Sequence, residues 1–265
     1  MNFIAQIIHN KSISPNAGRM MLSLDSKLYI KAFNTIEPGQ FIHLKINNEL
    51  LLRRPFSIYD VLQNKKIEII YQVVGQGTKL MRQLKPGKKL TLFGPLGKGF
   101  KLTPNTRHAI LAGGGIGIAG LHLLLKYLVH SKCYNITVLL GARTKNQLYC
   151  LTDFKRLSTN IHVATEDGSV GIKGMVTDLL NKTINSQHGK PVIYSCGPIP
   201  MINAICNIVT KYNIPAQVSM ESRMGCGIGL CRGCVCKVVK KPGSWDWATV
   251  CNEGPVFKAD KLYRR

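Results

Sequence analysis

The stretch HAILAGGGIGIAGLHLLLKYLV, residues 108–129, determines the fold of the middle of the chain. It opens as a short apolar strand, continues through a run of glycines, and ends in an apolar segment of helical length. A strand, a tight turn and a helix in this order are the repeating unit of a parallel, doubly wound sheet. The apolar run 109–125 contains five glycines and His122. It therefore predicts a buried strand-turn-helix and not a membrane span.

The same alternation continues downstream. Segments of strand character, separated mostly by stretches of helical length, read NITVLLGAR, IHVATEDG, PVIYSCGP and AQVSME. Together with HAILAG they make five strands, which predicts an α/β domain over residues 103–218.

Upstream, residues 1–102 contain short β-type runs broken by turn signals: FIAQII, FIHLKI, KIEIIYQVV and KKLTLFG. Short strands at this spacing predict a small barrel or sandwich. The last zone, residues 219–265, is rich in Gly and Cys. It has too few apolar residues for a core of its own, so other parts of the molecule must hold it in place.

The composition indicates a globular protein with a strongly basic surface. There are 36 Lys and Arg against 13 Asp and Glu, a net charge of +23. The basic residues are spread along the chain and form only pairs, such as Lys88-Lys89, so a solvated surface is favoured over a nucleic-acid site. Part of the excess could steer anionic dinucleotides. The N-terminal sequence has no signal-peptide pattern, and we expect a cytoplasmic protein.

Five of the nine cysteines fall in the last 40 residues. Four of them have the spacing Cys226-x4-Cys231-x2-Cys234-x16-Cys251, which is typical of plant-type [2Fe-2S] clusters. The glycines between them give the backbone the freedom to fold tightly around a small cluster. A structural zinc site is the alternative, but zinc ribbons usually carry two C-x2-C pairs and only one is present. Cys236 is expected to be a spectator.

Two further segments predict nucleotide binding. Arg54-Pro55-Phe56-Ser57 is expected at the end of a strand, and Gly77-Thr78 at the start of a helix, where backbone N–H groups can bind a pyrophosphate. Simpler readings are a surface Arg beside a turn proline and a plain helix cap at Thr78.

The glycine turn after the strand HAILAG allows close approach of a second pyrophosphate, although it departs from the strict G-x-G-x-x-G pattern and could serve packing alone. Cys196-Gly197-Pro198 follows a later strand, at the sheet edge where ligands bind in α/β folds. Arg143, also at a strand end, could touch ribose or phosphate, or be solvated.

Taken together, RPFS at 54–57, GPLGKGF at 94–100, GGGIG at 113–117 and CGP at 196–198 resemble the ferredoxin reductase family. That resemblance implies an FAD-binding β-barrel over residues 1–102, a nicotinamide-binding α/β domain over 103–218 and a [2Fe-2S] segment over 219–265. The match narrows with MESRMGCGIGLCRGC at 220–234, VCNEGPVF at 250–257 and TEDGSVGIKGMVTD at 165–178. These resemble the electron-transfer subunits of two-subunit, NAD-linked dihydroorotate dehydrogenases.

The resemblance implies roles for particular residues. FAD would be bound by Arg54, Pro55, Phe56, Ser57, Tyr71, Gln72, Val73, Gly77 and Thr78. NAD would be bound by Gly113, Gly114, Gly115, Gly117, Cys196, Gly197 and Pro198, and the cluster by Cys226, Cys231, Cys234 and Cys251. Gln72 stands where the family often has Arg, and Lys98 where it has Asn.

By the same resemblance, dihydroorotate is oxidised on a partner subunit that carries FMN, in a heterotetramer of pyrimidine (UMP) biosynthesis. This chain would pass the electrons through [2Fe-2S] and FAD to NAD+. No side chain here need act as acid or base, and neither nucleic acid nor a membrane is expected as a partner. The alternative is a small subunit of another NAD(P)H-ferredoxin or sulfide-linked flavoprotein complex.

Overall fold

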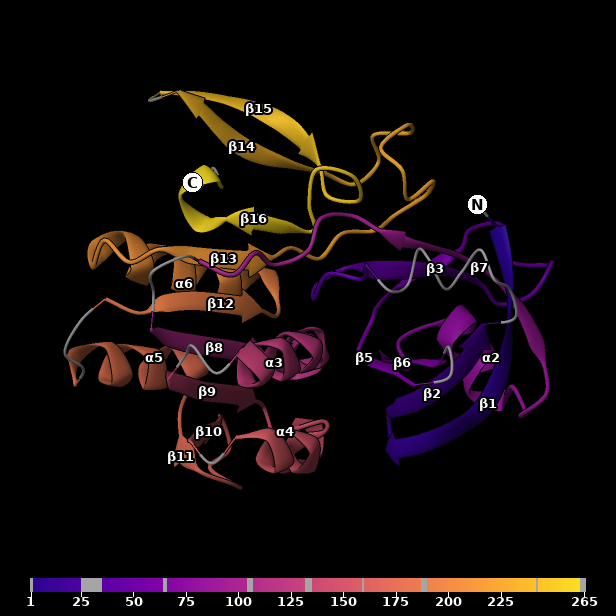
Figure 1. Ribbon diagram of the computed structural model, residues 1–265, viewed down its shortest axis with the longest axis horizontal. Coiled ribbons are helices and arrows are strands. Elements are labelled where there is room, and N and C mark those ends of the chain that lie inside the picture. The colour runs from indigo at the N-terminus through magenta and orange to yellow at the C-terminus, as the bar shows by residue number, and fades with distance from the viewer. Residues whose placement is uncertain are drawn as a thin grey trace.

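The computed structural model describes residues 2–24, 35–63, 66–103, 107–131, 135–158, 160–186, 190–241 and 243–262. Two seven-stranded sheets lie side by side, and the C-terminal segment runs along the top of the view in Figure 1. None of the helices described combines the length and the apolar character needed to cross a membrane.

The first sheet is antiparallel and forms the barrel domain, with strand order β4-β3-β7-β1-β2-β6-β5. Its core is made by alternate residues of the strands, as in β2, where every second side chain is buried. Helix α2 (Gln76–Gln83) packs against it. The strands are β1 (Asn2–Ser14), β2 (Ala17–Leu24), β3 (Phe41–Lys45), β4 (Arg54–Ser57), β5 (Asp60–Leu62), β6 (Lys66–Gln72) and β7 (Lys89–Leu96).

The four β-type runs expected in this part of the sequence are β1, β3, β6 and β7. The structure adds β2 and β5, and it makes RPFS a strand in its own right, β4, and not the end of one. Pro55 lacks a backbone N–H, yet it is accommodated because β4 is an edge strand that pairs only with β3.

The second sheet has the order β11-β10-β9-β8-β12-β13-β16 and is parallel except for β16. The five strands predicted from the sequence are confirmed as β8 (His108–Gly114), β9 (Asn135–Ala142), β10 (Ile161–Thr165), β12 (Val192–Cys196) and β13 (Ala216–Ser219). The structure adds the short strand β11 (Ile172–Lys173) and β16 (Val256–Lys258).

Helices cover both faces of this sheet, as a doubly wound fold requires. Buried residues of α3 (Ala119–Ser131) and α4 (Leu151–Leu157) share a core with Leu111, whereas those of α5 (Val176–Asn185) and α6 (Ile199–Lys211) share one with Ile110. Successive residues of β8 therefore point into different cores, which explains its unbroken apolar sequence. Short 3-10 turns lie at Gly115–Ile118, Lys145–Gln147 and Ala259–Lys261.

The C-terminal segment is fixed to both domains by backbone pairing. In the barrel domain, Lys98 donates its N–H to the Gly254 carbonyl at 2.6 Å and accepts one from Val256 at 3.4 Å. On the other side, β16 pairs with β13, and Met220 N–H donates to the Pro255 carbonyl at 2.9 Å. The rest of the segment contains one hairpin, β14 (Val235–Lys241) with β15 (Ser244–Thr249).

A polar network also joins the two large domains. Asp153 on α4 accepts a hydrogen bond of 2.7 Å from Arg19 on β2. It accepts another of 2.7 Å from the hydroxyl of Tyr59, a residue that follows β4 in the chain. Arg19 also pairs with buried Glu68, and the Tyr59 ring stacks on His122 of α3 with centroids 4.2 Å apart. Burial alone would raise the pKa of Asp153, but the Tyr59 hydrogen bond and the Arg19 charge outweigh it and hold the pKa below its usual value. The network therefore favours one fixed arrangement of the domains.

We expect Asp153→Ala to lower the free energy of unfolding by about 1.5–3 kcal/mol, because two hydrogen bonds to a charged group are lost. Urea denaturation of the purified protein measures this. The depressed pKa means that Asp153 contributes stability above its unfolded value of about 3.9, and that this is lost as the pH falls through the folded pKa. The difference between wild type and variant should therefore shrink below about pH 4.

The matched control is Arg156→Gln, which removes an exposed partner 3.4 Å from the other Asp153 oxygen. It should change stability by less than about 0.5 kcal/mol. Equal losses in the two variants would show that the contact between domains contributes nothing.

Candidate functional site

The cysteine-rich loop lies between the β14–β15 hairpin and the barrel. Cys226 and Cys231 are at the surface side of the loop, whereas Cys234 and Cys251 are about 1% exposed and pack with Phe41 of β3. Gly227 and Gly229 have φ of +77° and +85°, which favour glycine strongly. The loop can fold this tightly only because those positions lack a side chain.

Backbone N–H groups point at the sulfur atoms, and they define two pairs. Cys231 N–H lies 3.4 Å from the Cys226 sulfur, and Cys251 N–H lies 3.4 Å from the Cys234 sulfur. Further donors are Ile228 to Cys226 at 3.5 Å and Gly229 to Cys251 at 3.1 Å. N–H donors of this kind stabilise thiolates and the sulfur atoms of bound clusters.

Backbone N–H groups and burial act on the pKa values of these thiols in opposite directions. The N–H groups of Cys231 and Ile228 lower the pKa of Cys226 to about 6, which favours the ligating thiolate. Burial raises the pKa of Cys251 to about 12, so this thiol is neutral at pH 7 without a bound group.

Cys236 differs from these four. It lies on β14 opposite Ala248 and packs against the cluster of buried residues that contains Cys234 and Cys251, and burial raises the pKa of its thiol to about 11. Its side chain belongs to the packing beneath the hairpin.

Part of the predicted flavin motif meets at the start of α2. A Cβ on Gly77 would lie 3.0 Å from the Arg54 Nε, so the guanidinium covers the glycine at the helix N-terminus. The Thr78 hydroxyl accepts N–H bonds from Val74 at 2.9 Å and Gly75 at 3.2 Å. The N-cap of the helix is Gly75 and not Thr78, and the Thr78 hydroxyl bonds back to the N-cap backbone from the third helical position.

The side chains of three other predicted flavin residues, Tyr71 to Val73, do not all face the same part of the molecule. Tyr71 faces the barrel core, with its ring against Phe56 at 6.3 Å and its hydroxyl donating to Asn10 at 2.8 Å. Gln72, the next residue, lines the large pocket of the α/β domain. Val73 packs on the barrel core and donates its N–H to the Asn16 carbonyl at 2.8 Å. Of these three, only Gln72 lines that pocket.

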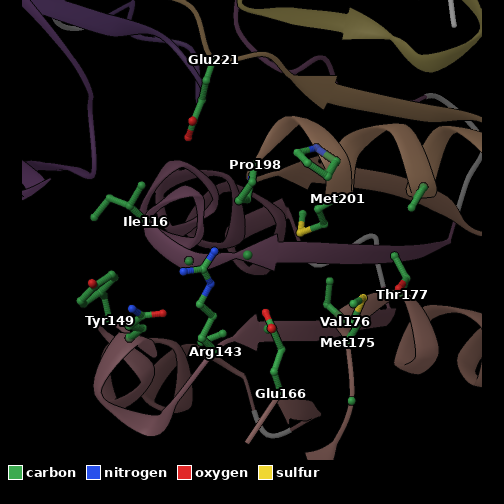
Figure 2. Close-up of a pocket in the computed structure, with 18 of the residues that line it drawn as sticks. Ile116, Arg143, Tyr149, Glu166, Met175, Val176, Thr177, Pro198, Met201 and Glu221 are labelled. Atoms are coloured by element: carbon green, nitrogen blue, oxygen red, sulfur yellow. The ribbon is translucent and has the colours of Figure 1, made fainter. Parts of the chain in front are cut away.

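That pocket has a volume of about 550 Å³ and lies at the carboxyl ends of the parallel strands. Of the residues predicted to bind NAD, Gly114, Gly115 and Pro198 line it. Figure 2 shows Glu221 reaching in from the side opposite Arg143 and Glu166. Since Gln72 comes from the barrel and Glu221 follows β13, all three parts of the chain contribute to the wall.

Gly113, Gly117 and Gly197 serve close packing behind the pocket. A Cβ on Gly117 would lie 2.6 Å from the Gly197 backbone, and a Cβ on Gly113 would lie 3.2 Å from the Ile118 Cα. The two strand ends can approach only without side chains here, which brings the β8 turn against the β12 end.

Cys196 is buried where the barrel meets the α/β domain. A Cβ on Gly120 would lie 3.0 Å from the Cys196 sulfur and 3.8 Å from the Ser57 hydroxyl, so both side chains lie close to Gly120. Burial raises the pKa of Cys196 to about 12, so the thiol is neutral at pH 7. Loss of hydration likewise raises the pKa of Glu221 at the pocket mouth.

The sequence analysis missed Glu221, Met201 and Tyr149 as pocket residues. Glu221 had a usable signal, since it follows a predicted strand at the edge where ligands bind. Met201 and Tyr149 come from a helix and from the turn before one, and nothing in their local sequence distinguishes them from ordinary apolar residues.

Three families of known domains match successive parts of the chain, in the order barrel, α/β domain and C-terminal segment. Residues 5–100 match the oxidoreductase FAD-binding domain and residues 111–207 the oxidoreductase NAD-binding domain. Residues 221–263 match the iron-sulfur cluster binding domain of dihydroorotate dehydrogenase B.

Whole-chain relatives agree. The chain is 39% identical over 83% of its length to the dihydroorotate dehydrogenase B (NAD(+)) electron transfer subunit of Desulforamulus reducens, covering 84% of that protein. It is 36% identical to the corresponding subunit of Caldanaerobacter subterraneus and 38% identical to that of a Geobacillus species. Each of these two alignments covers 97% of this chain, and they cover 97% and 96% of the relatives.

Among solved structures, an NADH-dependent reduced ferredoxin-NADP oxidoreductase superposes with a TM-score of 0.85 at 26% identity, over 98% of this chain and 89% of the other. A ferredoxin NADP+ reductase from Neisseria gonorrhoeae has a TM-score of 0.66 at 15% identity, over 79% and 91% of the two chains. The second likeness shows the fold alone.

We expect Gly117→Ala to weaken NAD(H) binding about tenfold or more, because the added methyl must push the glycine turn away from Gly197. Titration of the flavin-loaded protein with NADH, followed by the change in flavin absorbance, measures the dissociation constant. The flavin spectrum itself should be retained.

Ser131→Ala, at the far end of the helix that follows this turn, is the control and should leave the affinity unchanged. Wild-type affinity in Gly117→Ala would mean that the close packing of the turn has no bearing on NAD(H).

Proposed function

Since the chain belongs to the family of electron transfer subunits of dihydroorotate dehydrogenase B (NAD(+)), we propose which of its residues hold each redox group. The family relationship makes it an oxidoreductase subunit with FAD-, NAD- and iron-sulfur-binding domains. Its activity is the transfer of electrons in NAD-dependent dihydroorotate oxidation.

Cys226 and Cys231 would hold one iron of a [2Fe-2S] cluster, and Cys234 and Cys251 the other. The two sulfur pairs, each with an N–H donor from within the pair, support this division. Bound in these domains, the cluster supplies one-electron transfer, FAD accepts one or two electrons, and NAD exchanges a hydride.

The observation that carries the proposal is the contact between the cysteine loop and the flavin strand. Gly227 packs on His43 of β3, and His43 is directly paired with Pro55 of β4. A single strand, with a spacing of about 4.8 Å to its neighbour, therefore separates the cysteine loop from the RPFS motif. Redox groups bound at these two places would be close neighbours.

The FAD pyrophosphate would lie at the N-terminus of α2, where Arg54 and the N–H groups of Gly77 and Thr78 supply positive charge. Pro55, Phe56 and Ser57 would carry the flavin ring along β4, with contributions from Tyr71 to Val73. Tyr71 and Phe56 meet edge to face on the barrel side, so their part in this site is to fix the position of strands β4 and β6 under the ring.

Nicotinamide would enter the pocket above β8 and β12. Gly114, Gly115 and Pro198 would meet the dinucleotide directly, and Gly113, Gly117 and Gly197 would hold the two strand ends together. Cys196 and Ser57 both lie close to Gly120 at the boundary with the barrel, which supports a position there for the two ring systems. Glu221 would limit the depth to which the anionic dinucleotide enters.

A catalytic partner subunit follows from membership in this family. We propose that the partner carries FMN and that the assembly is a heterotetramer in the cytoplasm. The eight free cysteines among the described residues support a reducing compartment. We further propose the domain limits 1–102, 103–218 and 219–265.

Reconstitution with the catalytic subunit tests the function. We expect dihydroorotate-dependent reduction of NAD+ by the purified complex and none by either subunit alone. Light scattering after size exclusion should give the mass of two copies of each subunit. Ferredoxin-dependent activity in the absence of any dihydroorotate-dependent activity would contradict the assignment.

The cluster ligands are tested by single substitutions. Cys234→Ala and Cys251→Ala should each reduce iron and acid-labile sulfide from about two of each per chain to near zero. Each variant removes a buried ligand that water cannot replace. Cys236→Ala should retain both. Iron and sulfide analysis with anaerobic visible spectra measures this, and a lost cluster in Cys236→Ala alone would overturn the ligand set.

A further inference from the structure

His43 occupies the boundary between the barrel and the cysteine loop. Its neighbours along β3, Ile42 and Leu44, belong to the barrel core, whereas Phe41 packs with Cys234 and Cys251. His43 points to the same side of the strand as Phe41, and the two rings meet edge to face at 5.7 Å.

The imidazole is enclosed against the loop that contains the first cysteines. A Cβ on Gly227 would lie 2.8 Å from the His43 Nδ1 and 2.9 Å from its Cε1, and His43 has no exposed surface. Gly227 directly follows Cys226. The absence of a side chain at Gly227 is therefore what lets the histidine ring reach into the loop.

Both ring nitrogens of His43 lack a hydrogen-bond partner among the described residues. Burial, together with the nearby Arg53 charge, lowers the pKa of His43 to about 4. At neutral pH the ring is uncharged and carries one N–H donor. Buried polar groups in native proteins are almost always hydrogen-bonded, so an orphaned donor at this place indicates an acceptor supplied by a bound group.

We propose that His43 donates its ring N–H to a sulfur atom of the bound cluster and thereby raises the reduction potential of the cluster. This rests on the proposed ligand set. The apolar side chains around the ring, Phe41 and Leu96, offer no acceptor. A cluster sulfur does, and an N–H dipole stabilises the more negative, reduced form. His43 is in this sense a positioning and tuning residue and not a catalytic one.

Redox titration of the cluster, followed by its EPR signal, tests this in the full chain loaded with FAD and cluster. His43→Phe keeps a ring but removes the donor, and should make one-electron reduction about tenfold less favourable, a shift of about 59 mV to lower potential. His43→Gln keeps an N–H donor and should recover at least part of the shift.

Two control variants separate hydrogen bonding from packing. Phe41→Leu alters the neighbouring ring without removing a donor, and His130→Phe removes an exposed histidine elsewhere. Both should leave the potential near the wild-type value. A shift in Phe41→Leu equal to that in His43→Phe would overturn the proposal.

A direct measurement covers the case in which His43→Phe assembles poorly. Pulsed EPR of the reduced wild-type protein labelled with 15N-histidine should show a nitrogen coupled to the cluster, and the coupling should vanish in His43→Gln labelled in the same way. A cluster signal without that coupling, or an unchanged potential in His43→Phe, overturns the role of His43. Absence of any cluster signal in wild type would instead refute the ligand set.

Discussion

The arrangement depends on the backbone pairing of residues 254–258 with both large domains. Lys98 of the barrel and β13 of the α/β sheet hold this short stretch from opposite sides. Since the C-terminal segment has no core sufficient to fold alone, these bonds fix where its cysteines lie. They also fix Glu221, because Met220 beside it is bonded to Pro255. One short stretch, made of Gly254, Pro255 and strand β16, thus sets the relative positions of the cluster loop, the flavin strand and the dinucleotide pocket.

Two buried groups at this junction are uncharged. Cys196 and His43 are both kept neutral by burial; Cys196 lies beside Gly120, as Ser57 of β4 does, and His43 is paired with Pro55 of the same strand. The ionised groups Arg19, Glu68 and Asp153 are gathered in a separate network between the domains.

The features predicted correctly from the sequence are those that depend on a few neighbouring residues. The apolar run of β8 and the cysteine spacing each carry their meaning within a few residues, and both predicted the right class of structure. Strand β16 could not be predicted, because its three residues gain their conformation from β13, which lies nearly 40 positions earlier. The burial of His43 could not be predicted from the sequence either. In sequence it is one polar residue in the strand FIHLKI, and only the approach of Gly227 shows that its outward face is buried. Thr78 also differs from the local reading, since Gly75 is the N-cap and the Thr78 hydroxyl bonds back to it from the third helical position.

The backbone pairing of residues 254–258 with both domains has a consequence for how the protein is assembled. These residues and the last cysteine, Cys251, follow the barrel and the parallel strands of the α/β sheet along the chain, so those parts leave the ribosome first. The four cysteines can take up iron and sulfide together only after the barrel and these strands have been synthesised.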